Sequence, residues 1–132
     1  MKDCMESVAA YFKGNRSYLG NSIFEYALYK NWQELEHLKE FIDGLPDGSF
    51  DKPKLASQRK KALFNKIDEV VLKVAAGNYT DAISKLFHDI RAKMDGDSTA
   101  QDWIIDSVTQ FKLCVIIDHI IESITILREE SG

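Results

Sequence analysis

The chain is poor in the residues that cross-link a fold or interrupt helices. Its 132 residues include only two cysteines, Cys4 and Cys114, and two prolines, Pro46 and Pro53. Two distant cysteines without a CxxC pair exclude a disulfide framework, so we expect both thiols to be free. Both prolines fall in Gly44–Lys54, which also contains Gly48. This segment is therefore the one clear interior loop, and long helices are possible on either side.

The sequence also lacks an excess of positive charge and a long apolar run. Its net charge is -4, which disfavours nucleic acid and anionic membrane surfaces as partners. The most apolar stretch, Leu113–Leu127, contains Asp118, His119 and Glu122 and is too short to cross a bilayer, so we expect no membrane insertion. The first residues carry acids where a signal peptide would be basic, which predicts a cytoplasmic protein. An extracellular location is expected instead if the chain belongs to a larger surface protein.

Catalytic and cofactor motifs are missing as well. The chain contains no GxSxG elbow, phosphate-binding glycine loop or dinucleotide fingerprint, and Cys114 lies in an apolar helical run where a thiol is usually inert. The residues Asp95–Thr99 resemble the start of a calcium loop. However, Ala100 stands where the turn needs glycine, and Asp106 replaces the usual glutamate. We predict a protein that is not an enzyme and has no cofactor.

The three histidines do not form a metal motif. His37, His88 and His119 lack HExxH spacing, although His119 and Glu122 share one helical face. Because two donors do not make a site, we predict no bound metal.

The residues that are present indicate a helical protein. Apolar residues make up 45% of the chain and charged residues 29%, which is ordinary for one globular domain of this length. We predict an all-α, single-domain bundle of about four to six helices over residues 1–132. An aromatic-rich N-terminal part (1–45) precedes a helical core (57–128).

Apolar spacing and capping residues predict the helices that precede the last one. Short helices are expected at Asp3–Lys13 and Tyr18–Tyr29, and Asn31 with Glu34 three residues later predicts the start of a new helix. A helical hairpin is expected at 57–94, with helices Ser57–Ala76 and Tyr79–Met94, Gly77 at the turn, and a cap from Asn78 with Asp81. The apolar face of the second helix is expected to contain Ala82, Ile83, Leu86, Phe87 and Ile90.

The last predicted helix, at 107–128, is expected to be central because apolar residues cover much of its circumference. Asp106 and Ser107 would cap it, and its residues after Arg128 would fray. Its predicted core positions are Val108, Phe111, Val115, Ile120, Ile124 and Leu127.

Aromatic residues are concentrated near the N-terminus. A small chain cannot easily bury all of them, and tyrosine and tryptophan are favoured at binding hot spots. The predicted partner-binding residues are Tyr18, Tyr26, Tyr29 and Trp32. A basic concentration at Lys52, Lys54, Arg59, Lys60, Lys61 and Lys66 is interpreted as a soluble surface, because acidic residues offset it elsewhere.

Several short runs carry a resemblance to a known family. They are Gln58–Leu63, Ala76–Tyr79, Asp102–Ile104 and Leu113–Cys114. Over residues 38–127 the chain resembles the FIMAH-like helical accessory modules of secreted and surface proteins of archaea and bacteria. The resemblance implies a module without catalytic residues that mediates attachment or association.

Two functions are therefore expected from the sequence. The first is a non-enzymatic helical module that binds another protein. The alternative is a small cytoplasmic inhibitor of the immunity type, which binds and blocks a toxin or a defence enzyme.

Overall fold

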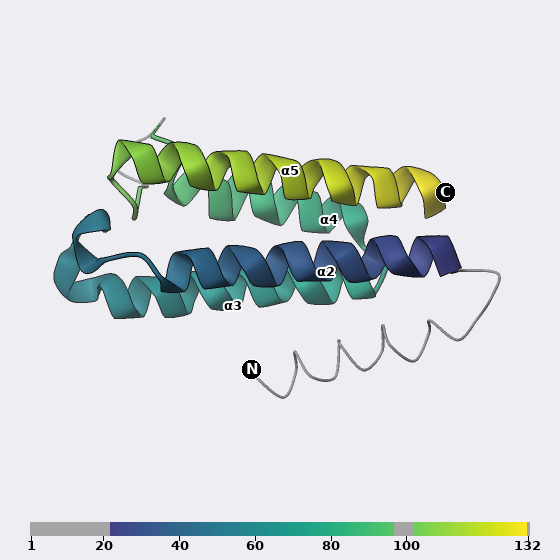
Figure 1. Cartoon of the computed structure of the whole chain (residues 1–132), viewed down its shortest axis with the longest axis horizontal. Coiled ribbons are helices and arrows are strands. Elements are labelled where there is room, and N and C mark those ends of the chain that lie inside the picture. Colours follow the sequence, from purple (N-terminus) through teal and green to yellow (C-terminus); the bar gives the residue numbers. More distant parts are fainter. Residues whose placement is uncertain (1–21, 97–101, 132) are drawn as a thin grey trace.

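The described residues of the protein, 22–96 and 102–131 in a computed structural model, form four long helical segments packed side by side. Figure 1 shows α2 (Ser22–Asp43) and α5 (Ser107–Ser131) lying next to each other and running in opposite directions. Behind them lie α3 (Ala56–Ala75) and the helical segment that begins with α4 (Tyr79–Ser84). No strand occurs among these residues, so the predicted all-α bundle is confirmed.

One continuous helix replaces the two that were predicted around Asn31. α2 runs from Ser22 to Asp43 without a break, and Asn31 lies in its middle with 1% of its surface exposed. The predicted cap is wrong because this part of α2 contains no proline or glycine to end a helix. α2 ends where Gly44 and Pro46 follow it. The expected segment Asp3–Lys13 and residue Tyr18 lie outside the described residues.

The hairpin turn matches the prediction in detail. α3 begins one residue before the expected start, and its five predicted core residues are all buried: Leu63, Ile67, Val70, Val71 and Val74. Gly77 has a positive φ of 80°. The Asn78 N–H donates to the Lys73 carbonyl at 2.8 Å and the Gly77 N–H to Val74 at 3.0 Å, the pattern of a Schellman cap. The Asn78 side chain, however, makes no capping hydrogen bond.

The second arm of the hairpin changes its winding along its length. After α4 the chain continues as a π-helix, η4 (Lys85–Ile90), and a 3₁₀ turn, η5 (Arg91–Lys93). The wider π winding keeps residues four apart on one face, and Ala82, Leu86, Ile90 and Met94 are fully buried at that spacing. Phe87, which was expected on this face, is half exposed.

The core face of α5 differs from the predicted one. Its buried residues are Thr109, Leu113, Ile117, Ile120, Ile124 and Leu127, so three of the predicted core positions are correct. Val108, Phe111 and Val115 instead lie on the exposed side of the helix. α5 does contact both α2 and α4, as expected of a central helix. It continues to Ser131, where fraying after Arg128 was predicted.

Two connections meet at one end of the bundle. The loop after α2 contains two 3₁₀ turns, η2 (Asp47–Ser49) and η3 (Pro53–Leu55). Buried Phe50 of this loop pairs with buried Ile104, which precedes α5, in an isolated antiparallel bridge. The Ile105 N–H donates to the Ser49 carbonyl at 2.9 Å, and the Asp51 N–H donates to the Trp103 carbonyl at 2.8 Å. These bonds join the two connections.

No helix of the described residues is long and apolar enough to span a membrane.

Candidate functional site: the groove between α2 and α5

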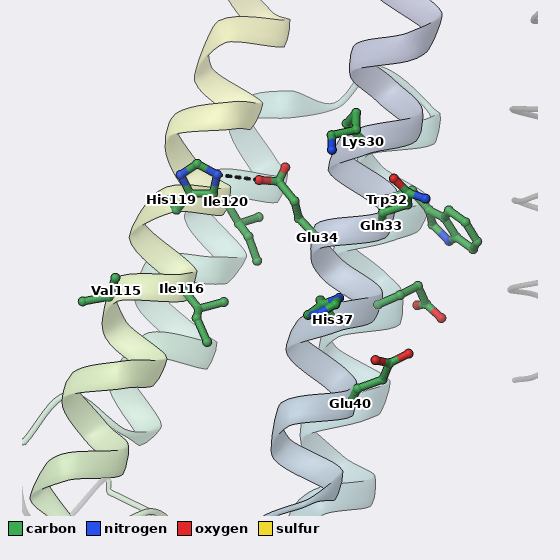
Figure 2. Close-up of a pocket in the computed structure, with 11 residues that line it drawn as sticks. Lys30, Trp32, Gln33, Glu34, His37, Glu40, Val115, Ile116, His119 and Ile120 are labelled. Carbon is green, nitrogen blue, oxygen red and sulfur yellow. Dashed lines mark ion pairs between the residues drawn. The ribbon is translucent and has the colours of Figure 1, made fainter.

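A surface groove of about 760 Å³ lies between α2 and α5. Figure 2 shows the two helices as its sides. From α2 it is lined by Lys30, Trp32, Gln33, Glu34, Glu36, His37 and Glu40, and from α5 by Val115, Ile116, His119 and Ile120.

The two sides of the groove differ in chemistry. On the α5 side, Ile120 is buried, Ile116 is half-buried and Val115 is exposed. Apolar side chains therefore line this side of the groove from the core to the surface. The α2 side carries mainly charged and amide side chains, because helical spacing turns Leu35 and Leu38 into the core. An apolar surface beside a polar edge is typical of a binding groove.

One ion pair crosses the groove. The Nε2 atom of His119 lies 2.8 Å from Oε2 of Glu34, and the Ser123 hydroxyl donates to the same oxygen at 3.2 Å. The dashed line in Figure 2 marks the histidine contact. Both contacts join α2 to α5 at the surface.

A strip of apolar side chains extends from the groove over the outer face of α5. Phe111 is 71% exposed, and Ile105, Val108 and Val115 are also exposed. The spacings of three and four residues from Val108 to Phe111 and Val115 place these three side chains on one side of α5. Ile105 precedes the helix. We call Val108, Phe111, Val115 and the half-buried Ile116 together the α5 face. Contiguous exposed apolar surface of this kind usually marks an interaction site.

The predicted aromatic residues do not form one exposed patch. Tyr26 is 56% exposed, and it shares a helical side with the groove residues Lys30 and His37, which follow it by four and eleven positions. Tyr29 and Trp32 are half-buried against the core, with ring centroids 5.5 Å apart. Trp32 also lines the groove. Tyr18 lies outside the described residues.

A second charged cluster joins α2 to α3. The Lys39 ammonium lies 2.7 Å from Oδ1 of buried Asp68 and 3.4 Å from Oε2 of Glu36. Burial raises the pKa of the Glu36 carboxyl, although the nearby Lys39 opposes this shift. The cluster lies along the contact between two helices, so we interpret it as a packing feature.

Three of the six basic residues named above form hydrogen bonds or ion pairs with other residues of the chain. Lys60 donates to the carbonyl oxygens of Asp43 and Leu45 at 2.7 Å each, and so closes the end of α2. Arg59 pairs with Asp51 and Lys66 with Asp89. Lys52, Lys54 and Lys61 are exposed. All six residues reach the surface, in line with the predicted soluble surface, and Lys52, Lys54 and Lys61 are the most exposed of them.

The candidate metal ligands are dispersed. His37 and His119 line the groove, whereas His88 lies on η4. Within residues 22–96 and 102–131, no group of three or more His, Cys, Asp or Glu side chains is arranged to hold a metal ion. Cys114 is half-buried, and its thiol faces the Met94 carbonyl at 3.8 Å. Cys4 and the central residues of the calcium-like segment lie outside the described part.

The sequence prediction missed the α5 face as a surface. The available signal was the low amphipathicity of this helix, since apolar residues occur on the side opposite the core as well as on the core side. Such a helix either is fully enclosed or presents an apolar face to a partner. The chain matches no known protein family, no curated protein and no solved structure.

Proposed function

We propose that this chain is a non-enzymatic protein-binding module that contacts its partner through the α5 face and the adjoining groove. The exposure of Phe111, at 71%, is the observation that carries the proposal. Burying such a side chain against a partner contributes roughly 1.5–3 kcal/mol. Aromatic anchors of this kind dominate the binding energy of many interfaces.

The polar groups of the groove support binding more than catalysis. Ser123, Glu34 and His119 are the residue types of a hydrolytic triad, but the carboxylate of Glu34 lies between the other two. In a triad the histidine lies between the hydroxyl and the carboxylate, because it must remove the proton of the nucleophile. Here the hydroxyl of Ser123 donates to Glu34, so this arrangement does not activate it as a nucleophile.

Two forms of this function use the same surface. The resemblance of residues 38–127 to FIMAH-like modules favours an attachment module of a larger surface protein. An acidic chain of this size, with a net charge of -4, also suits a cytoplasmic inhibitor that covers its target. In both forms the α5 face meets the partner, and the identity of the partner distinguishes them.

The test is a capture experiment with matched variants. The double variant Phe111→Asp with Val115→Asp places two charges on the α5 face. Leu72→Asp is the control, because Leu72 is also an exposed apolar residue but lies on α3. We expect a protein captured from a lysate of the source organism to bind the native chain and the control, and to be lost with the double variant.

Direct titration of the purified partner then checks the result. Calorimetry should give a dissociation constant at least roughly a hundredfold weaker for the double variant, since two buried contacts are lost. Circular dichroism must show equal helicity for all three proteins. Equal affinity of the native chain and the folded double variant would overturn the proposal.

A further inference from the structure

We infer that the α5 face binds a second copy of the chain, so that two α5 helices pack against each other as a symmetric antiparallel dimer. This inference rests on the proposed function and deepens it, because it names the partner of the α5 face. Its basis is the order of apolar and charged residues along the exposed side of α5. A phenylalanine on the neighbouring helical segment provides a second, independent observation.

The exposed side of α5 has the residue spacing of a helix that pairs with another helix. Six residues follow one another at alternating steps of four and three residues and are all exposed: Val108, Lys112, Val115, His119, Glu122 and Ile126. We call them the α5 row. This alternation places side chains in one nearly straight line, as in two-stranded coiled coils. Figure 1 shows α5 along one edge of the bundle, so a second helix can approach the row.

The α5 row is complementary to itself when it is read in the opposite direction. Its residues form three pairs, each equally far before and after position 117: Val108 with Ile126, Lys112 with Glu122, and Val115 with His119. Two antiparallel copies of α5 centred on this position therefore place the two members of each pair side by side. The apolar ends of the row then meet each other, and each charge meets its opposite.

The charged residues that interrupt the apolar side chains select this partner. Lys112 and Glu122 are exposed, and neither forms an ion pair within the described part of the chain. An antiparallel second copy supplies the opposite charge to both residues, at two places related by the two-fold axis. A parallel copy would instead set lysine against lysine and glutamate against glutamate, which is repulsive. A purely apolar partner would leave both charges unpaired.

The segment from α4 to η5 runs antiparallel to α5 along one flank of the row. The Arg91 guanidinium donates to the Asp118 carboxylate at 2.9 Å, and further along α5 the Arg128 guanidinium donates to the Thr80 hydroxyl at 3.4 Å. Phe111 precedes Asp118 by seven residues, or about two helical turns, so it lies on the same flank of α5. An aromatic side chain is therefore exposed on the side of α5 next to this segment.

Phe87 of η4 lies where the dimer would place Phe111 of the second copy. Phe87 precedes Arg91 by four residues, so it lies near the level of Glu122 along α5. In the dimer, Phe111 of the second copy lies at the level of Ser123, one residue further along. Both phenylalanines are exposed in the single chain. The two-fold axis would form two Phe87–Phe111 contacts and cover these rings.

The contact is small, so the dimer should be weak. A specific interface usually buries about 1,200–2,000 Å² in total, and we expect one pair of helices with two aromatic contacts to lie near the low end of this range. The net charge of -4 on each copy also opposes association. We expect a dissociation constant on the order of tens of micromolar. Folding stabilities are therefore measured below this concentration, where the monomer predominates.

Analytical ultracentrifugation across a concentration series tests whether the chain dimerises. We expect the native chain to change reversibly from monomer to dimer between about 1 µM and 1 mM. The double variant Phe111→Asp with Val115→Asp should stay monomeric, and Leu72→Asp should dimerise as the native chain does. Phe87→Asp, which lies outside α5, should weaken the dimer roughly tenfold or more. Circular dichroism checks that all variants are folded.

A charge exchange tests the pairing of Lys112 with Glu122. Lys112→Glu sets two glutamates beside each other in the dimer and should weaken it roughly tenfold or more. The double variant Lys112→Glu with Glu122→Lys restores opposite charges, so it should dimerise within about threefold of the native affinity. Lys61→Glu makes the same change in net charge on α3 and should leave the dissociation constant nearly unchanged.

Disulfide crosslinking tests the antiparallel arrangement. In a background without the native thiols, Cys4→Ser with Cys114→Ser, we expect the variant Val108→Cys with Ile126→Cys to form a covalent dimer on mild oxidation. The two positions lie roughly 27 Å apart within one chain, and a disulfide needs α-carbons within about 7 Å of each other, so the bond can form only between copies. Val108→Cys alone should crosslink much more slowly, because the antiparallel arrangement separates the two copies of position 108.

The outcomes separate this inference from the proposed function. A native chain that stays monomeric up to about 1 mM, or a dimer that persists in the Phe111→Asp, Val115→Asp variant, would overturn this inference. Crosslinking of Val108→Cys alone as fast as that of the double cysteine variant would overturn it as well. If a monomeric native chain captures a different protein that the aspartate variant loses, the proposed function stands without this inference. If no protein, including the chain itself, needs the α5 face, both fail.

Discussion

At the scale of single residues, two ion pairs of similar geometry lie in different surroundings. The Lys39–Asp68 pair, at 2.7 Å, includes a carboxylate whose side chain is only 8% exposed. The Arg91–Asp118 pair, at 2.9 Å, includes one that is 53% exposed. Removing one partner of a buried pair leaves a charge with little solvent, whereas an exposed partner is readily hydrated.

The substitution Asp68→Ala should therefore destabilise the fold by about 1–3 kcal/mol. Asp118→Ala should cost less than about 1 kcal/mol. Urea unfolding followed by circular dichroism measures both free energies. Lys39 still pairs with Glu36 in the Asp68→Ala variant, and this pair limits the loss of folding stability. Equal losses for the two variants would show that burial does not control the strength of these pairs.

Asn31 shows why some residues could not be placed from the sequence. Asparagine followed by glutamate three residues later is a capping pattern, yet in this chain the asparagine is buried in mid-helix, and neither polar atom of its side chain has a hydrogen-bond partner. The tertiary contacts of α2 override the local preference, because continuing the helix buries apolar residues on both sides of Asn31. A local sequence pattern contains no information about the stability gained by burying those apolar residues.

At the scale of elements, the turn between α3 and α4 depends on backbone conformation. Gly77 has a positive φ, and a β-carbon added there would meet nothing within 4 Å. Any cost of a side chain at this position is therefore conformational. Gly48 has equally open surroundings but no positive φ, so it is a matched control.

We expect Gly77→Ala to destabilise the protein by about 1–2 kcal/mol, because alanine in the left-handed region is strained. Gly48→Ala should be neutral or stabilising by up to about 1 kcal/mol, since it reduces the entropy of the unfolded chain. Thermal and urea unfolding of both variants would check this. A stable Gly77→Ala variant would mean that the turn adopts another conformation without loss.

The predictability of the elements varied with the strength of their local signals. α3 and its turn were predicted to within one or two residues, because regular apolar spacing and a glycine act together there. The π-helix η4 was not predicted. Its winding depends on how Leu86 and Ile90 fit the core, and this fit is decided by the neighbouring helices.

At the scale of the whole molecule, α5 has two apolar sides and the fold uses only one. Ile117 is fully buried, whereas Phe111 lies on a different side of the helix and is mostly exposed. Ile117→Ala should cost about 2–5 kcal/mol of folding stability through the cavity it leaves. Phe111→Ser should change stability by less than about 0.5 kcal/mol, since the helix propensities of the two residues are similar.

Chemical denaturation of both variants measures this difference. A loss for Phe111→Ser comparable to that for Ile117→Ala would show that Phe111 is part of the core in solution. That result would remove the main support for the α5 face as a binding surface.

The candidate site could be predicted only in part, because α5 is apolar on more than one side. Periodicity alone does not decide which side of an apolar helix faces the core, so Phe111 and Val115 were assigned to the interior. Of the four predicted binding residues, Tyr26 borders the groove and is exposed, while Tyr29 and Trp32 pack against the core. The packing of α2 against α5 brings together residues 89 positions apart, such as Glu34 and Ser123. Local sequence patterns do not predict such contacts.

The bridge between Phe50 and Ile104 gives the molecule an uneven distribution of motion. It joins the two connections at one end of the bundle. At the opposite end lie the turn at Gly77 and the outer ends of α2 and α5 (Figure 1), and there the Arg128 guanidinium donates to the Thr80 hydroxyl at 3.4 Å. We expect slow amide exchange near the bridge, where backbone hydrogen bonds link residues that are far apart in the sequence. Val108 and Phe111 follow Ile104 closely in the sequence, so the bridge anchors the start of the α5 face to the loop after α2.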